Sequence, residues 1–135
     1  MHEPYEKRKG RPADFRVSYR FYTPEEGGRQ TIPFQGYRSD FLYDNSDYPK
    51  PKAPTFQVFM ILPEFEDTNG DIILDNTKSV NASGTARMWI INPPFRTKHA
   101  SGIKVGIRGY FMEGPKKVAE CTVIEILGLA TDPTE

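Results

Sequence analysis

Cysteine and histidine are scarce in this sequence, and their scarcity excludes several classes of protein. Cys121 is the single cysteine among 135 residues, so the chain forms no internal disulfide, as expected in a reducing compartment. His2 and His99 are the two histidines, and neither lies at metal-ligand spacing from another ligand. We therefore expect no metal and no cofactor, and we predict that both histidines are solvated at the surface.

Long apolar runs and an excess of charge are also lacking. No stretch approaches the roughly 20 apolar residues that a membrane helix needs, and the N-terminus has no apolar segment typical of a secretory signal. Eighteen basic and eighteen acidic residues give a formal net charge of zero. This balance argues against a protein that coats nucleic acid or an anionic membrane. We expect a cytoplasmic protein that does not bind membranes.

Motifs of catalysis are missing as well. The sequence has no G-x-x-x-x-G-K-[ST] to hold a nucleotide and no G-x-S-x-G. Cys121 lies in an alternating segment, where a cysteine is usually a small core residue. An enzyme is therefore the least favoured class, and a pocket that joins Cys121 to His99 would be needed to support one. An acidic run does not follow the order of an EF-hand and is predicted to be a solvated hairpin rim: Glu64, Glu66, Asp67, Asp71 and Asp75.

Apolar and polar residues alternate along most of the chain, and this alternation predicts β-strands. The clearest case is Phe15 to Phe21, which reads as a half-buried strand with one solvated face. No segment has helical periodicity with caps, so the pattern predicts an all-β fold, either an antiparallel barrel or a sandwich. Further strands are predicted at 37–43, 56–62, 71–74, 85–92, 104–112 and 117–127, with a loop at 44–55 and turns at Asn69-Gly70 and Gly114-Pro115.

The length of the chain corresponds to one domain. Residues 1–13 carry the basic cluster Lys7-Arg8-Lys9 and are predicted to be a flexible basic tail, with an RNA-contacting arm as the alternative. Residues 14–128 are assigned to a single β-barrel domain, and residues 129–135 to a C-terminal tail.

The segment 25–38 is the most distinctive part of the sequence. It begins with Glu-Glu-Gly-Gly-Arg at 25–29, continues through Pro33-Phe34, and ends with Gly36-Tyr37-Arg38. The residue types predict a strand end, a glycine turn and a proline-kinked entry into the next strand. Such a loop can direct arginines outward. On residue types alone, a well-packed loop with solvated charges is the favoured interpretation.

This segment resembles the opening of the C-terminal β-barrel (domain 3) of elongation factor Tu and related translation GTPases. Ser39 stands where that family usually has proline. Residues 61–64 and 84–93 resemble the family's third and fourth strands, which leaves about 65–83 as an inserted hairpin, and residues 102–118 resemble the C-terminal hairpin. The resemblance spans about residues 15–127. It implies an all-β fold, a six-stranded antiparallel Greek-key β-barrel with an inserted hairpin and no catalysis of its own.

In that family the barrel contacts partner domains and, on one side, the T-stem backbone of aminoacyl-tRNA. The resemblance, together with the residue chemistry, selects five candidate binding residues: Arg29, Tyr37, Arg38, Lys116 and Lys117. No part of this sequence resembles the family's GTPase domain or its second barrel, so we expect neither GTP hydrolysis nor codon-dependent delivery from it. In addition, residues 119–121 replace a glycine-rich stretch of the family.

We therefore expect a stand-alone, non-catalytic protein-interaction module with a protein partner or self-association, and no nucleotide. An accessory RNA-binding protein is the alternative. The first hypothesis predicts an apolar patch near Phe95, Tyr110 or Trp89. The second predicts that the four basic candidates converge on one exposed face.

Overall fold

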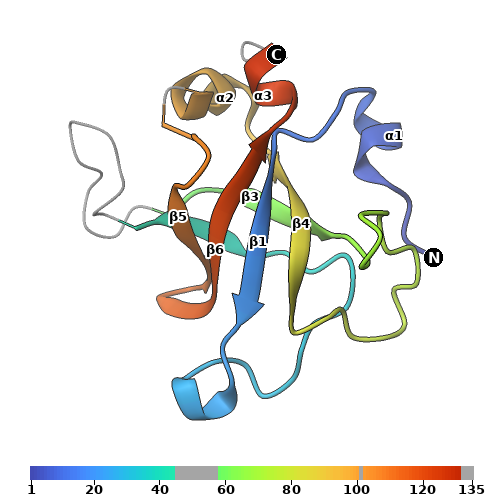
Figure 1. Cartoon of the computed structure of the whole chain (residues 1–135), viewed down its shortest axis with the longest axis vertical. Helices are drawn as coiled ribbons and strands as arrows, with labels where there is room; N and C mark the ends of the chain where they lie inside the picture. Colours follow the sequence, from blue (N-terminus) through green and yellow to red (C-terminus); the bar gives the residue numbers. More distant parts are fainter. Residues whose placement is uncertain (45–57, 101, 132–135) are drawn as a thin grey trace.

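The computed structural model describes residues 1–44, 58–100 and 102–131, and it is built on one antiparallel sheet curled into a half-barrel (Figure 1). The strands lie side by side in the order β2-β5-β6-β1-β4-β3. None of the helices in these ranges is long and apolar enough to cross a membrane. The strands are β1 (Phe15–Phe21), β2 (Asp40–Tyr43), β3 (Ile61–Phe65), β4 (Ser83–Ile90), β5 (Arg108–Glu113) and β6 (Lys116–Ile126). The helices are α1 (Tyr5–Lys9), the 3₁₀ helix η1 (Pro24–Glu26), α2 (Pro93–Ala100) and α3 (Gly128–Thr131).

Strand β1 lies in the middle of the sheet, paired with β6 on one side and β4 on the other. Phe15, for example, lies opposite Ile126 on β6 and Met88 on β4. Every second residue of β1 is buried, beginning with Phe15 and ending with Phe21. The alternation predicted from the sequence is therefore confirmed, because one face of β1 meets the core while the other is partly solvated.

The two outer strands of the sheet approach each other at one end. There the backbones of Phe41 in β2 and Phe59, just before β3, exchange two hydrogen bonds of 2.8 and 2.9 Å. Pro63 lies in β3, an outer strand, where its missing N–H is tolerated. The predicted antiparallel sheet of six strands is confirmed, with the predicted 56–62 strand shifted to β3. Residues 45–57, which include most of the loop predicted at 44–55, lie outside the described residues.

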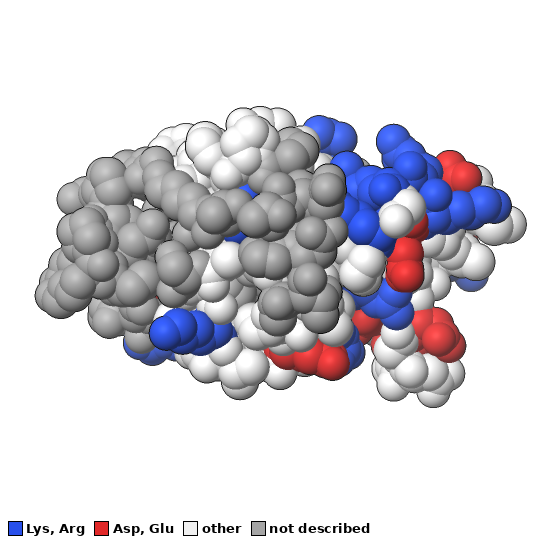
Figure 2. Space-filling model, turned by 90° about the horizontal axis from the view of Figure 1, so that it is seen from above, with Lys and Arg blue, Asp and Glu red and all other residues white. Residues whose placement is uncertain are grey.

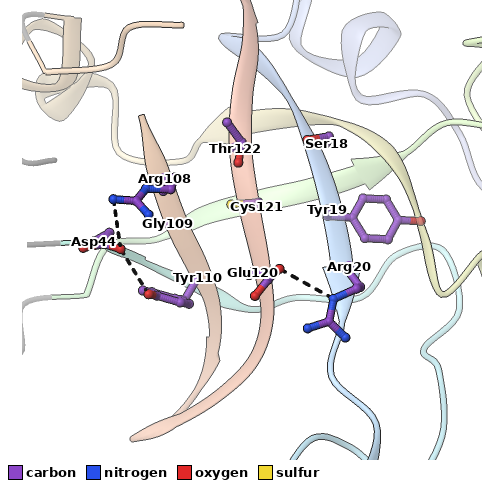
Figure 3. A pocket seen from close by; sticks show the side chains of 10 residues that line it. All are labelled: Ser18, Tyr19, Arg20, Asp44, Arg108, Gly109, Tyr110, Glu120, Cys121 and Thr122. Carbon is purple, nitrogen blue, oxygen red and sulfur yellow. Dashed lines mark hydrogen bonds and ion pairs between the residues drawn. The ribbon is translucent and has the colours of Figure 1, made fainter. Parts of the chain in front are cut away.

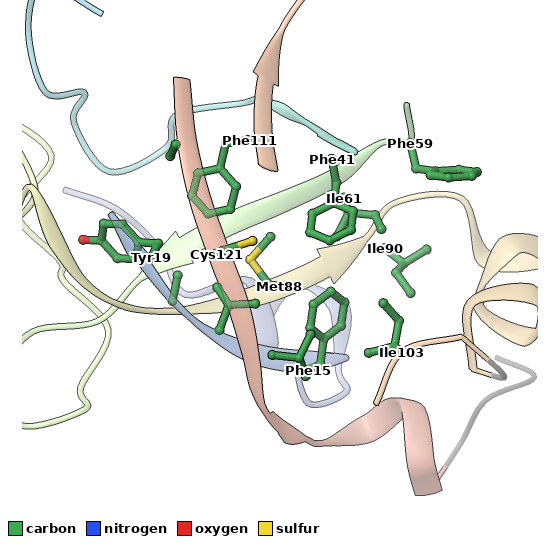
Figure 4. Packing of buried hydrophobic residues seen from close by; sticks show 14 of the residues in the cluster. Phe15, Tyr19, Phe41, Phe59, Ile61, Met88, Ile90, Ile103, Phe111 and Cys121 are labelled. Atoms are coloured by element: carbon green, nitrogen blue, oxygen red, sulfur yellow. The ribbon is translucent and has the colours of Figure 1, made fainter. Parts of the chain in front are cut away.

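Aromatic side chains fill the concave side of the half-barrel (Figure 4). Tyr19 and Phe65 meet edge to face with ring centroids 5.1 Å apart, and Phe15 meets Phe41 at 6.3 Å. Each such pair stabilises the fold by about 1 kcal/mol beyond the free energy that comes from burying the two rings. Cys121 lies in this core, as the sequence predicts, and burial raises the pKa of its thiol.

The prediction that no helix is present is wrong, because α2 follows β4 directly. Pro93 and Pro94 end the strand but are compatible with the first turn of a helix. The helix has no apolar stripe that the sequence could reveal. Instead, Arg96 is fully buried and its Nε lies 2.6 Å from an Asp14 carboxylate oxygen. The other oxygen of Asp14 accepts a 2.7 Å hydrogen bond from the Ile90 N–H, so this one carboxylate connects α2 to the end of β4.

Four polar residues predicted to be solvated are buried, and each has a distant partner. His2 Nε2 lies 2.6 Å from Glu64, and His99 Nδ1 lies 2.7 Å from the Tyr43 hydroxyl. Glu66, the fourth of them, is bound by two arginines at 2.7 and 2.8 Å: Arg16 and Arg87. Burial of a charged or polar group requires such partners, and nothing local in the sequence indicates them.

The segment between β3 and β4 is a loop with a tight turn rather than a full hairpin. Gly70 has a φ of +84° and its N–H donates to the Asp67 carbonyl at 3.0 Å, so the turn predicted at Asn69-Gly70 is present. The strand predicted at 71–74 is reduced to one isolated bridge between Ile72 and Glu66.

Both ends of the described chain pack against the sheet. Residues 1–13, predicted as a flexible tail, include α1, and the His2 N–H donates to the Leu74 carbonyl at 2.8 Å. At the other end Leu129, in the predicted C-terminal tail, is buried in the core. Residues 132–135 lie outside the described residues.

Candidate binding surfaces

The distinctive segment of the sequence begins with a tightly built turn. The hydroxyl of Thr23 accepts from the Glu26 N–H while the Glu26 carboxylate accepts from the Thr23 N–H, which forms a capping box. Gly27 then adopts a φ of +91°, where a side chain would be strained. A Cβ on Gly28 would lie only 2.2 Å from the carbonyl oxygen of Tyr22. The two consecutive glycines are thus required by the backbone for two different reasons.

Arg29 and Tyr37, two predicted binding residues, turn toward each other and toward Glu113 at the end of β5. The Arg29 guanidinium lies 2.5 Å from the Glu113 carboxylate and 5.1 Å from the centre of the Tyr37 ring, and the Tyr37 hydroxyl donates to the same carboxylate. Burial alone would raise the pKa of Glu113, but the hydrogen bonds from Tyr37 and Arg29 outweigh it and the pKa is lowered. We call residues 27–37 the fastened loop, because these contacts hold it to β5.

Gln35 also holds the fastened loop, and its role has no signal in the sequence. Its buried side-chain amide donates to the carbonyls of Phe65 and Ile73, both at 2.9 Å, and accepts from the Phe65 N–H. Just beyond the loop, the hydroxyl of Ser39 is buried with no hydrogen-bond partner among the described residues. The resemblance expects a proline at that position, which would bury no hydroxyl.

Arg38 has different surroundings from its neighbour Tyr37. It is exposed and lines a cleft of about 230 Å³ together with α1, the side chain of Leu62 and that of Ile91. The α1 residues of this cleft are Tyr5, Arg8 and Lys9, whose i, i+3, i+4 spacing puts them on one face of the helix. We call this surface the α1 cleft. The sequence shows the basic cluster at residues 7–9, but it does not indicate that Arg38 lies beside it.

The basic residues of the α1 cleft form no ion pairs with the part of the chain that the structure describes. Within the described residues, no carboxylate forms an ion pair with Arg8, Lys9 or Arg38. Burial and the nearby Glu64 raise the pKa of Tyr5, while Arg38 and Arg8 act in the opposite direction. Seen from above, Lys and Arg side chains gather over α1 (Figure 2). The cleft is therefore electropositive.

Helix α1 is held in place from below by the Glu64 carboxylate. This carboxylate accepts from the Tyr5 N–H at 2.9 Å and from the indole N–H of Trp89 at 2.9 Å, and it contacts His2. Trp89 is fully buried, with its ring 5.9 Å from that of Tyr5. The position of the cleft wall is thus set by buried hydrogen bonds rather than by the short helix alone.

Lys116 and Lys117 lie at the start of β6, next to the turn with β5. The Lys117 ammonium lies 4.0 Å from the centre of the Tyr110 ring, and the charge of Lys116 helps to lower the pKa of Glu113. Lys116 thus lies near the fastened loop, and Arg38 is the one member of the predicted basic set that lines the α1 cleft.

A second concave surface, the sheet-face groove, crosses β1, β6 and β5 and measures about 290 Å³ (Figure 3). Its charges are paired with one another. Arg20 binds Glu26 at 2.9 Å and Glu120 at 3.5 Å. Asp44 lies 3.9 Å from Arg108 and accepts from the Tyr110 hydroxyl at 3.2 Å. The groove includes Cys121 but not His99, so it does not form the Cys–His pocket that an enzyme hypothesis would need.

The three residues predicted to form an apolar patch differ in exposure. Phe95 on α2 is 42% exposed, Tyr110 is half-buried and Trp89 is completely buried. The prediction of Trp89 as an exposed anchor is wrong, because α1 covers it. The basic side chain of Arg96, also on α2, is buried and paired with Asp14.

No known family model matches this chain, and a search of curated proteins found no match either. Within the described residues, no cluster of His, Cys, Asp and Glu could hold a metal ion. By architecture the described residues form an antiparallel half-barrel, and they include a basic cleft whose rim pairs with no described carboxylate.

Proposed function

We propose that this chain is a non-catalytic protein-interaction module built on a Greek-key barrel of the elongation factor Tu domain 3 type. The motif at 25–38 supports the proposed relationship, because most of its characteristic residues have a folding role here. Glu26 caps η1, the two glycines form the turn, and Arg29 and Tyr37 fasten the loop. When the matching residues of a motif each have a folding role, the match favours a shared backbone arrangement over chance similarity.

The observation that carries the proposed function is the α1 cleft. It combines three basic side chains, none of which pairs with a carboxylate of the described residues, with an apolar floor made by Leu62 and Ile91. Unpaired charge beside apolar surface is typical of a site completed by another molecule. In the fastened loop and the sheet-face groove, by contrast, arginines are already paired within the chain.

The absence of catalysis is also part of the proposal. A nucleophilic cysteine requires a lowered thiol pKa and access to solvent. Cys121 has the opposite environment, because it is buried and burial raises its pKa.

RNA binding is the second candidate, and the gathering of Lys and Arg side chains over α1 favours it (Figure 2). Guanidinium groups bind phosphate without reading sequence. The net charge of zero and the small size of the cleft argue for a short contact rather than a continuous backbone track.

The test is a pull-down with the full chain from cells of its source, with and without nuclease, followed by rebinding with the purified partner. A protein partner that survives nuclease and binds again in purified form supports the proposed function. Loss of every partner upon nuclease treatment would contradict it and favour RNA binding.

A further inference from the structure

The α1 cleft has a chemical composition that restricts what it can bind. Its rim is basic, through Arg8, Lys9 and Arg38, and its floor is apolar, through Leu62 and Ile91. Met60, which is 52% exposed, precedes Leu62 by two residues, and its carbonyl accepts from the N–H of the cleft residue Ile91 at 3.1 Å.

We propose that the α1 cleft binds an acidic peptide segment of a partner protein, in which carboxylates flank one apolar side chain. This inference rests on the proposed function as a protein-interaction module and names the chemistry of the partner. The carboxylates meet the basic rim, where guanidinium groups form paired hydrogen bonds with carboxylates. The apolar side chain covers the floor, which has a volume of about 230 Å³ above it.

The surroundings of Tyr5 favour a peptide over a single-stranded nucleic acid. Proteins that bind single strands offer open aromatic faces on which bases stack. The Tyr5 ring is instead engaged by His2 at 5.0 Å, by Trp89 at 5.9 Å and by the Arg8 guanidinium at 5.7 Å. The cleft thus offers charge and aliphatic surface but no open aromatic face on this ring.

Hydrogen bonds within the chain already order the wall of the cleft in the absence of a partner. The Glu64 carboxylate holds the backbone of Tyr5 and the ring of Trp89, both at 2.9 Å. A site whose wall is already ordered loses less conformational entropy on binding. Glu6, the acidic residue of α1, lies 3.8 Å from Arg87 and does not line the cleft.

The experiment measures fluorescence anisotropy of a fluorescein-labelled peptide, Gly-Glu-Asp-Leu-Glu-Asp-Gly, with the full chain at about 0.15 M salt. We expect saturable binding, and we expect Arg38→Glu and Arg8→Glu each to weaken it by about tenfold or more. Lys104→Glu, a matched charge reversal in the segment between α2 and β5, is expected to leave affinity within about twofold, because charges beyond about 8 Å are screened. Replacing the leucine of the peptide by serine is expected to weaken binding by about tenfold.

Both altered arginines are exposed, and circular dichroism of each variant shows whether the fold is kept. The inference is overturned if the peptide does not saturate the wild-type chain, or if folded Arg38→Glu and Arg8→Glu chains bind it as well as wild type does. Tighter binding of a twelve-nucleotide oligouridine, with the same two variants weakening it, would also overturn it in favour of RNA.

Failure of the acidic-peptide inference can be distinguished from failure of the proposed function. A nuclease-resistant partner that still binds the Arg38→Glu and Arg8→Glu chains would overturn the peptide inference but leave the interaction module intact. A wild-type chain with no nuclease-resistant partner would overturn the interaction module itself.

Discussion

Arg29 and Arg38 are nine positions apart in one motif, yet they belong to two regions with opposite properties. In the fastened loop, Arg29 stacks on Tyr37 and both side chains bind Glu113. In the α1 cleft, Arg8 lies over Tyr5 in a similar way, but no described carboxylate pairs with it or with Arg38. The arginine and tyrosine chemistry is the same in both regions. What differs is what the nearby carboxylate binds. Glu113 pairs with the arginine of the first region, whereas Glu64 binds the backbone N–H of Tyr5 and forms no ion pair with Arg8 or Arg38.

The largest expected effect comes from breaking the turn that delivers the fastened loop. Gly28→Ala places a Cβ 2.2 Å from the backbone carbonyl oxygen of Tyr22, which cannot move aside as a side chain can. We expect a loss of about 3 kcal/mol or more in the free energy of unfolding, measured by urea denaturation. Gly27→Ala is the matched control. Its Cβ meets nothing within 4 Å, so it bears only the strain of a positive φ, about 1 to 2 kcal/mol. Equal losses for the two variants would show that no close contact exists at Gly28.

A smaller effect is expected from removing the carboxylate that distinguishes the two regions. Glu113→Gln keeps the shape of the side chain but removes the charge that Arg29 and Tyr37 share. We expect a loss of about 1 kcal/mol of stability, because the pair is partly exposed. Arg38→Gln, in the α1 cleft, is expected to change stability by less than about 0.5 kcal/mol. Should Arg38→Gln prove as costly as Glu113→Gln in urea denaturation, the comparison between the two regions would fail.

The smallest expected effect is the pH dependence of the stability difference between wild type and Glu113→Gln. The pKa of Glu113 is lowered from its ordinary value of 4.5 in the folded chain, so the unfolded chain binds more protons as pH falls. The stabilisation is therefore fully present above about pH 4.5 and is lost as pH falls through the lower folded pKa. Urea denaturation between pH 3 and 7 is expected to show the gap between wild type and Glu113→Gln closing at the acidic end. The gap between wild type and Arg38→Gln stays constant, because arginine does not titrate in this range; a closing gap there would contradict the assignment.

The sequence predicted the sheet well wherever a strand has one face in the core. The alternation from Phe15 to Phe21 gave the position of β1, and Gly114-Pro115 correctly marked the turn between β5 and β6. Helix α2 escaped prediction because it lacks an apolar stripe and depends instead on the pairing of Arg96 with Asp14, 82 residues away in the sequence.

The candidate site was predicted only in part. The motif drew attention to Arg29, Tyr37 and Arg38 together, and the basic cluster in residues 1–13 was noted separately. That Arg38 and Arg8 share a cleft depends on α1 being held by Glu64, which was expected to lie in solvent.

The local sequence determined the positions of the strands, the tight turns and the need for glycine, because alternation and backbone angles are properties of neighbouring residues. Which charges became buried, paired or open was decided only when the chain folded. Glu64 meets His2 across 62 positions and Arg29 meets Glu113 across 84. A charge is structural or available according to what lies within a few ångströms of it, and only the tertiary structure sets those distances.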